Sequence, residues 1–417
     1  MSIDTAPGTD AAITLPGPDG APYQYQLGNQ ALCGPGDWTF PGAPITSRKV
    51  YSAVHVVPRT TADNTPGAPA DLDWDTTLGI RHHIWRYGLG VADAMDTAQR
   101  GMGLDWAATR QLIDRSAAEA AAMVAAPPPA LVGLGVGDLL ACGAGTDQLD
   151  LAGLGSGRSA LSAVRDAYLE QLDHVQASGA KVIIMCSRAL AAVAESATDY
   201  LDLYGELLGR AEQPVILHWL GTAFDPALAG YWGSDDIATA TDTFVGLLSE
   251  HADKVDGVKV SLLDASHEVA LRRRLPAGVR LYTGDDFNYP ELIDGDGEHH
   301  SDALLGIFAA IAPAASTALQ AYDAGDAVRA RQILDSTREL GRHIFSTPTF
   351  HYKTGIALVA WLNGLQPGFQ MVGGMHSSRS LPHLARTFTL ADEAGLLEDA
   401  DLACERMNLL LKSGGLA

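Results

Sequence analysis

One lysine in this sequence lies where a charged side chain is costly. Lys259 stands between two valines in the segment VDGVKVSLL, residues 255–263, whose β-branched and apolar residues predict a buried strand. An unpaired ammonium group is unfavourable in such a strand, so Lys259 needs either a partner or a function. Burial disfavours the charged form of a lysine, and an uncharged amine can attack a carbonyl carbon to form a Schiff base. The pattern alone also allows a structural ion pair, or a strand end from which the amine reaches water.

The elements that would position Lys259 form a strand–helix–strand unit. ASHEVALRRRL, residues 265–275, has the spacing of a helix and ends at Pro276. VRLYTG, residues 279–284, is a second short apolar strand. A βαβ unit of this kind is typical of parallel sheets.

Two motifs of this unit resemble those of the dihydrodipicolinate synthase and N-acetylneuraminate lyase family of class I aldolases. GVKVSLLD, residues 257–264, is similar to the family's G-[IV]-K-x-[ST] strand, and TGDD, residues 283–286, is similar to its [ST]-G-D-[DE] strand end. The resemblance implies that Lys259 is the Schiff-base lysine. It also implies that the pocket is lined by Ser261, Thr283, Gly284, Asp285 and Asp286.

A histidine occupies the position of the family's catalytic tyrosine. QPVILHW, residues 213–219, resembles the family's P-x-[IV]-[IL]-Y-N-[VI]-P strand, with His218 in place of the tyrosine. At the carboxyl end of a barrel strand, an imidazole could transfer protons at neutral pH. From the residue alone, a core histidine hydrogen-bonded to a neighbouring loop is the other interpretation.

Two segments depart from the family's pattern. Where the family has G-T-[TS]-G-E to hold a substrate carboxylate, this chain offers only Thr97 and Gly101, and Asp93 and Asp96 add negative charge. Like charge puts a 2-oxo acid substrate in doubt. The fourth strand ends in Arg188 rather than in aromatic residues, and this arginine is either a bidentate clamp for an anion or a solvated cation.

Two other hypotheses remain open. Carboxylates and imidazoles could hold a divalent metal for a metal-dependent lyase or sugar isomerase, with Asp286, His299 and His300 as the first choice of ligands and Asp285, His55 and His376 as others. The third hypothesis is a barrel that only binds or scaffolds. Apolar filling around Lys259 would support the scaffold, and inward polar residues would argue against it.

The alternation of strand and helix patterns, together with the resemblance, predicts an α/β fold of the (β/α)8 TIM-barrel type over residues 48–312. Residues 1–47 would form an N-terminal extension in which YQYQLG, residues 23–28, pairs as an edge strand or hairpin. Residues 313–417 would form a C-terminal helical domain. Within it, residues 345–365 resemble the family's F-x-x-P-N-P-x-x-x-K-x-x-[LM] region, with matches at Pro348 and Lys353. The eight strands are expected at 49–57, 88–94, 130–137, 181–187, 213–219, 255–263, 279–284 and 303–311.

Composition limits the partners. A formal net charge of −22 argues against nucleic acid and against anionic membrane surfaces. The four scattered cysteines show no CxxC pair, and no signal peptide or membrane-spanning segment is evident, so we expect a cytoplasmic protein. The resemblance further implies a homodimer or homotetramer.

Taken together, the sequence predicts a Schiff-base-forming lyase or aldolase that acts on a small carbonyl substrate, such as a keto-sugar, sugar acid or 2-oxo acid. Lys259 would be the nucleophile and His218 the proton shuttle, and no cofactor is needed. The chain looks like a divergent subgroup of the family whose function is not defined.

Overall fold

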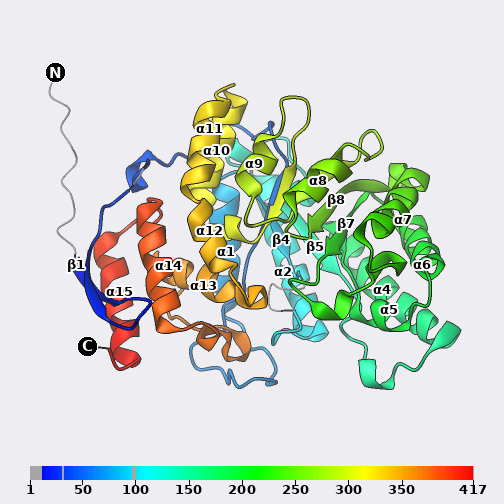
Figure 1. Cartoon of the computed structure of the whole chain (residues 1–417), viewed down its shortest axis with the longest axis horizontal. Helices are drawn as coiled ribbons and strands as arrows, with labels where there is room; N and C mark the ends of the chain where they lie inside the picture. The colour runs from blue at the N-terminus through cyan, green and yellow to red at the C-terminus, as the bar shows by residue number, and fades with distance from the viewer. Residues whose placement is uncertain (1–11, 31, 96–99, 417) are drawn as a thin grey trace.

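A closed barrel of eight parallel strands forms the centre of the molecule (Figure 1). The computed structural model describes residues 12–30, 32–95 and 100–416. Around the barrel, each strand pairs with the next in sequence, and the last closes on the first. The predicted TIM barrel is therefore confirmed. Its strands are β3 (Val50–Ala53), β4 (Gly90–Asp93), β5 (Leu140–Ala144), β6 (Lys181–Ile184), β7 (Val215–Leu220), β8 (Val255–Ser261), β9 (Arg280–Thr283) and β10 (Asp302–Leu305).

Helices in the connections between strands cover the outside of the barrel (Figure 1). Aspartates fix where several of them begin, because a carboxylate at the N-cap accepts a backbone N–H that has no partner within the helix. Asp73, for example, accepts from Thr76 N, and Asp264 accepts from His267 N. The longer covering helices are α1 (Trp74–Arg86), α2 (Trp106–Ala125), α4 (Gly157–Ser178), α6 (Ala197–Arg210), α7 (Ile237–Glu250) and α8 (Ala265–Arg272), and the shorter ones are α3 (Val136–Leu139), α5 (Arg188–Val193) and α9 (Tyr289–Asp294).

The two-residue period of a strand separates the barrel interior from the outer core. In β7, Leu217 packs in the large apolar core outside the barrel, whereas Ile216 belongs to a separate small cluster inside it. The same alternation in β8 sends Val258 and Val260 outward. Lys259 therefore points inward. The interior cluster consists of Tyr51, Ala53, Ala92, Met95, Ala141, Ile183, Met185, Ile216, Tyr282 and Leu304.

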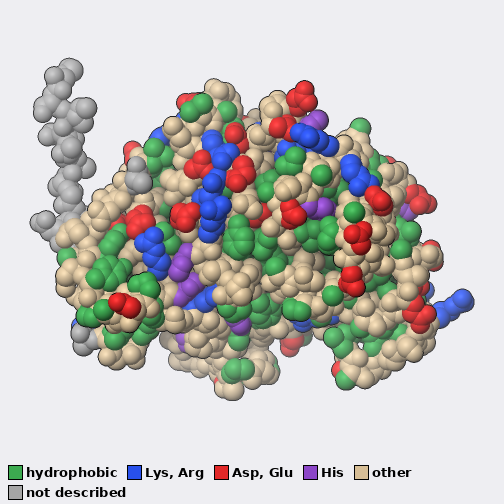
Figure 2. Space-filling view, viewed as in Figure 1, with side chains coloured by type: hydrophobic (Ala, Val, Ile, Leu, Met, Phe, Trp, Pro, Cys, Tyr) green, Lys and Arg blue, Asp and Glu red, His purple; other side chains and the backbone are tan. Residues whose placement is uncertain are grey.

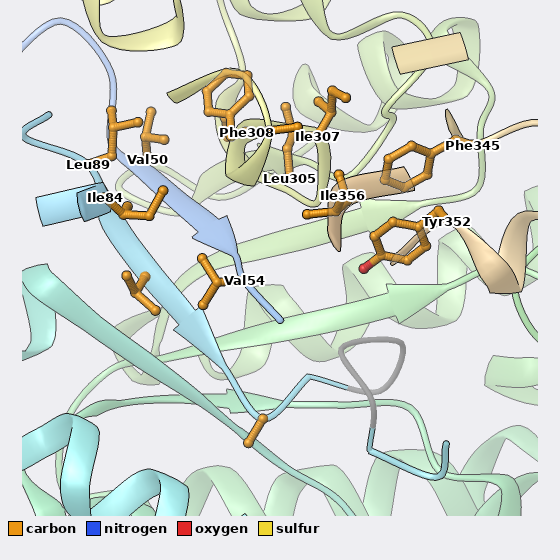
Figure 3. Close-up of a cluster of buried hydrophobic side chains, with 14 of the residues drawn as sticks. Val50, Val54, Ile84, Leu89, Leu305, Ile307, Phe308, Phe345, Tyr352 and Ile356 are labelled. Atoms are coloured by element: carbon orange, nitrogen blue, oxygen red, sulfur yellow. The ribbon is translucent and has the colours of Figure 1, made fainter. Parts of the chain in front are cut away.

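The C-terminal helices pack against one side of the barrel and reach its rim. Figure 3 shows Phe345, Tyr352 and Ile356 beside Leu305 and Ile307, which lie at the end of β10 and just after it. Gly306 permits this approach, because a Cβ there would lie 2.6 Å from Cε2 of Tyr352. The helices of this region are α10 (Ala312–Asp323), α11 (Ala327–Ser336), α12 (Arg338–Ile344), α13 (Lys353–Leu362), α14 (Leu381–Glu393) and α15 (Ala400–Ser413).

The N-terminal segment pairs with itself and then docks on the C-terminal helices. Strands β1 (Ala12–Pro16) and β2 (Pro22–Gln26) form an antiparallel hairpin beside α14 and α15 (Figure 1). The buried carboxylate of Asp392 accepts from Tyr25 Oη at 2.8 Å and from Gly28 N at 3.1 Å. The first and last parts of the described chain are thus joined.

The third barrel strand was predicted wrongly. Residues 130–137 do not form a strand, because Gly133 has a φ of 83° and the Asp138 carboxylate caps the N–H of Gly135 to begin α3. The strand follows as β5. The eighth strand is also shorter than expected, since the backbone turns into a 3-10 helix (Ile307–Ala309) after Gly306.

Positive and negative side chains lie side by side on one part of the visible surface. Figure 2 shows Lys and Arg interspersed with Asp and Glu over α11 and α12. There Arg338 bonds both Glu291 and Asp335 at 2.6 Å. Within the described ranges, no helix combines the length and the apolar character that crossing a bilayer requires.

Candidate functional site

Lys259 lies inside the barrel toward the carboxyl end of β8. It pairs in register with His218 on β7 and with Tyr282 on β9, and only 8% of its surface is exposed. Gly284 packs directly against the side chains of Lys259 and Ser261. A Cβ at this position would lie 3.0 Å from Cε of Lys259 and would overlap Oγ of Ser261. A glycine directly after β9 is thus what leaves room for the lysine side chain.

Replacing Gly284 with alanine is expected to destabilise the protein by about 1–3 kcal/mol, the usual cost of forcing extra atoms into a packed interior. The added methyl group would also approach the Val260 carbonyl oxygen to 2.7 Å, and backbone cannot easily move away. Urea unfolding measures the effect. Gly246→Ala is the matched control, because Gly246 lies at an exposed position of α7 with nothing within 4 Å of its Cβ position, and alanine there should stabilise slightly. Equal stability of the two variants would contradict the close approach at Gly284.

His218 faces the interior beside Lys259. Its side chain is buried, and Nε2 lies 3.2 Å from Oγ of Ser261. Burial, with a smaller contribution from the charge of Lys259, lowers the pKa of His218 well below its ordinary value. The imidazole is therefore neutral near pH 7. It can accept a proton or exchange one with the Ser261 hydroxyl.

The two aspartates of the TGDD motif have different surroundings. The Asp285 carboxylate accepts from Phe287 N at 2.9 Å, from Asn288 N at 3.0 Å and from Asn288 Nδ2 at 2.8 Å, so it caps the turn after β9. Asp286 accepts from Ile307 N at 2.8 Å. Burial raises the pKa of Asp286 to about 7, although the charge of Lys259 acts in the opposite direction. Of these two aspartates, Asp286 is the one whose pKa is affected by the charge of Lys259.

A second buried lysine comes from the C-terminal helices. Lys353, the first residue of α13, is 1% exposed, and its Nζ donates to the carbonyl oxygen of Ala53 at the end of β3. Burial lowers the pKa of Lys353 to about 7; the charge of Asp286 opposes this shift and that of Lys259 adds to it. The sequence matched Lys353 to a family motif without a role. The signal that could have indicated one was a lysine shortly before the apolar segment IALVAWL, residues 356–362, far from the barrel strands.

Asp93 and Arg188, two residues that the sequence analysis placed near the substrate, each form an ion pair within the protein. Asp93 lies outside the barrel interior, where its Oδ1 bonds Nη2 of Arg81 at 2.6 Å and both side chains are fully buried. Its negative charge is thus neutralised rather than presented to a substrate. Arg188 forms an ion pair with Asp225, while 46% of its side chain remains exposed at the cavity wall. Asp96 and Thr97, the other residues predicted for this rim, lie outside the described residues.

A cavity of about 250 Å³ opens at the carboxyl ends of β5, β6 and β7. It is lined by polar groups that already have partners, including Arg100, whose guanidinium donates to the Ala94 and Gly143 carbonyls. Its walls also carry Leu220, two residues beyond His218. Two hydroxyls face each other there, with Oγ1 of Thr146 2.6 Å from Oγ of Ser187.

The hypothetical metal ligands do not meet. His299 and His300 precede β10, whereas Asp286 follows β9. The two strands are parallel, so these residues lie at opposite ends of the barrel. Throughout the described ranges, no three His, Cys, Asp or Glu side chains gather in a way that could hold a metal ion. Asp286, His299 and His300 therefore do not form the metal site that the hypothesis requires.

The interior around Lys259 is polar. His218, Ser261, Asp286 and Lys353 come from four separate segments of the chain and are all less than 5% exposed. Burying so many polar groups is costly, and a barrel that served only as a scaffold would more simply be filled with apolar side chains. The arrangement instead suits chemistry that uses an amine, a carboxyl group and a neutral imidazole together.

Comparison with known proteins identifies both a family and a fold. The family described as "Protein of unknown function (DUF993)" matches residues 13–416. A search of curated proteins gives no significant match. Solved structures with similar folds include YagE of E. coli K12, a prophage protein of the dihydrodipicolinic acid synthase family in complex with pyruvate (14% identity, TM-score 0.60, 84% of this chain and 99% of that chain). Dihydrodipicolinate synthase from Cyanidioschyzon merolae with lysine bound gives the same four values.

A third similar structure is the chloride-inhibited dihydrodipicolinate synthase from Acinetobacter baumannii complexed with pyruvate. Its identity is 15% and its TM-score 0.57, over 84% of this chain and all of that chain. At such low identity the similarity concerns the fold. The resemblance of the sequence to the dihydrodipicolinate synthase family is confirmed at that level.

Proposed function

The chain belongs to the DUF993 family, and for this member we propose a Schiff-base-forming lyase or aldolase that acts on a small oxo compound. The observation that carries the proposal is the position of Lys259. Lys259 faces inward near the carboxyl end of a barrel strand, the end at which barrel enzymes place their chemistry, and it lies beside a neutral histidine and a buried carboxylate.

In the proposed reaction, Nζ of Lys259 attacks the carbonyl carbon of the substrate. A C–N bond forms while the C=O π electrons move to oxygen, which takes up a proton, and the nitrogen loses one. The resulting carbinolamine takes up a proton on its hydroxyl group, loses water and becomes an iminium ion. The iminium accepts the electron pair released when a neighbouring C–C bond breaks or a proton leaves, and hydrolysis then returns the free lysine.

We assign His218 to the proton transfers of this cycle. A neutral imidazole at 3.2 Å from the Ser261 hydroxyl can pass protons through that hydroxyl toward the Lys259 adduct. Ser261 lies on the same strand two residues beyond Lys259, so both side chains face the interior. In this proposal, His218 and Ser261 together take the role of the tyrosine hydroxyl that the family resemblance implies.

The candidate substrates are keto-sugars, sugar acids and 2-oxo acids. Two of the structures with a similar fold contain pyruvate, a 2-oxo acid. The pairing of Asp93 with Arg81 removes one objection to such a substrate. The hydroxyls of Thr146 and Ser187 in the cavity beside β7 bond each other, and each also has capacity for a further hydrogen bond that a hydroxylated substrate could use. A homodimer or homotetramer remains part of the proposal.

Borohydride trapping tests the proposal on the full-length protein. The protein is incubated with pyruvate, dihydroxyacetone or fructose, reduced with sodium borohydride, and measured by intact mass and peptide mapping. We expect at least one compound to give a stable adduct on Lys259, because reduction converts the reversible imine into a secondary amine. Samples without the oxo compound serve as the control. An adduct confined to another lysine would exclude Lys259 as the nucleophile.

A further inference from the structure

The cavity of about 250 Å³ beside β7 combines an apolar wall with a few polar groups. It has room for roughly eight water molecules at the volume that each occupies in the liquid. Its apolar lining residues are Leu149, Leu151, Met185, Leu220 and Leu228. Apolar walls with a few convergent polar groups are typical of sites for small organic molecules.

The cavity borders the interior that holds Lys259. Met185 lines the cavity and also belongs to the cluster inside the barrel. Cys186, another lining residue, donates from Sγ to the backbone carbonyl oxygen of His218 at 3.1 Å. Leu220 lies two residues beyond His218 on β7, and His218 pairs in register with Lys259. A substrate whose carbonyl group lies at Lys259 could therefore extend past the end of β7 into the cavity.

The first arginine of the cavity wall is fully occupied by protein acceptors. Nε of Arg100 donates to Oδ1 of Asp147 at 3.0 Å, and Nη1 donates to the carbonyl oxygens of Ala94 and Gly143. Nη2 donates to Oε1 of Gln171 and lies 2.8 Å from Oδ1 of Asp147. Since a guanidinium has five N–H donors, Arg100 has none left for an anionic ligand.

The second arginine is also paired with a carboxylate. Nε of Arg188 donates to Oδ2 of Asp225, and both residues line the cavity. The ionised lining residues are therefore two arginines and two aspartates, Arg100 with Asp147 and Arg188 with Asp225, and their charges cancel. A carboxylate or phosphate in this cavity would meet no uncompensated positive charge, and its loss of hydration would be costly.

Thr146 presents unused hydrogen-bonding capacity to the cavity. Its side chain is buried, and among the described residues its Oγ1 bonds only Oγ of Ser187, at 2.6 Å. A hydroxyl group can donate one hydrogen bond and accept two. If Thr146 donates to Ser187, it can still accept; if it accepts from Ser187, it can also still donate. A ligand hydroxyl fits both arrangements because it donates and accepts, whereas an ionised group can only accept.

We propose that this cavity binds an uncharged, polyhydroxylated end of the substrate, with Thr146 as a hydrogen-bonding residue. The inference rests on the proposed function and deepens it, because it selects keto-sugars over sugar acids, sugar phosphates and simple 2-oxo acids. The hydroxyl groups of such a chain meet Thr146 and the paired charges, while its C–H groups pack on the leucines of the wall.

Sorbitol tests the site apart from the chemistry, because it has the hydroxyl chain of a sugar but no carbonyl group that could react with Lys259. Binding to the full-length protein is titrated by saturation-transfer NMR. We expect sorbitol to bind, and gluconate and sorbitol 6-phosphate to bind at least about tenfold more weakly, because their charged ends lose hydration without gaining a counter-charge. Absence of sorbitol binding, or tighter binding of either charged compound, overturns the inference.

Thr146→Val locates the binding. Valine keeps the shape of threonine and removes the hydroxyl, so sorbitol should bind roughly 3–10-fold more weakly, the usual effect of one hydrogen bond. Thr243→Val is the matched control, because the Thr243 hydroxyl donates to the Thr239 carbonyl oxygen at 3.3 Å within α7, away from the cavity lining. Equal affinities of Thr146→Val and Thr243→Val overturn the inference. Where Thr146→Val does not fold, Leu151→Trp at an exposed position of the wall narrows the cavity, and unchanged sorbitol affinity there has the same meaning.

The two assays separate this inference from the proposed function. If borohydride traps an oxo compound on Lys259 but sorbitol affinity does not respond to Thr146→Val, the function stands and the inference fails. If sorbitol binds and responds as expected but no oxo compound is trapped, the cavity binds a hydroxylated chain and the proposed Schiff-base function fails.

Discussion

Lys259→Arg is expected to abolish both borohydride-trapped adducts and turnover. Arginine keeps the positive charge and much of the length of lysine, but its guanidinium stays protonated at any accessible pH and cannot act as the attacking amine. The loss should exceed the range of the assay, because without an imine there is no electron sink for the later steps. Intact mass after reduction and a continuous assay with the trapped compound measure the two effects.

The matched control is Lys181→Arg. Lys181 also lies on a barrel strand, at the start of β6, where its Nζ bonds Asp256 at 3.1 Å. An arginine can maintain this ion pair, so trapping and turnover should be preserved. If Lys259→Arg retained full turnover, or if a chelator abolished the activity of the wild type, the Schiff-base mechanism would be wrong.

The barrel and the direction of Lys259 could be predicted because both depend on local patterns. Apolar strands alternating with amphipathic helices indicate a parallel sheet, and the family resemblance of the motifs indicates that the sheet closes into a barrel. Once β8 is recognised, the two-residue period sends Lys259 to the side opposite Val258 and Val260. The wrong position of the third strand has a local cause as well, since a run of small apolar residues with glycines fits a strand and a turn equally well.

The electrostatics of the site could not be predicted, because they depend on partners that are distant in sequence. Asp93 appeared to add negative charge to the substrate loop, but Arg81 on α1 neutralises it. Lys353 comes from the far end of the chain and still lies within reach of Ala53. Only the packing of α13 against the barrel rim, visible in Figure 3 through Tyr352 and Ile356, brings it there.

His218→Gln is expected to separate imine formation from turnover. Glutamine has a similar reach and can keep the hydrogen bond to Ser261, but it exchanges no protons near neutral pH. The imine on Lys259 should still form and be trapped, whereas turnover should fall by roughly 10²–10⁴-fold, the usual contribution of general acid–base catalysis. His267→Gln is the control, because His267 packs outside the barrel with its ring 5.6 Å from that of Trp219 and its Nε2 2.9 Å from Thr241.

The low pKa of His218 limits how far turnover should fall in His218→Gln. A base is effective when its pKa lies near the working pH, and burial beside Lys259 holds the pKa of His218 well below that range. The loss in His218→Gln should therefore lie toward the lower end of the interval. For the same reason, wild-type turnover should not decline through protonation of His218 until the pH falls well below 6.5. A decline that begins near pH 6.5 in the wild type and vanishes in His218→Gln would show that the imidazole is more solvated than its burial implies.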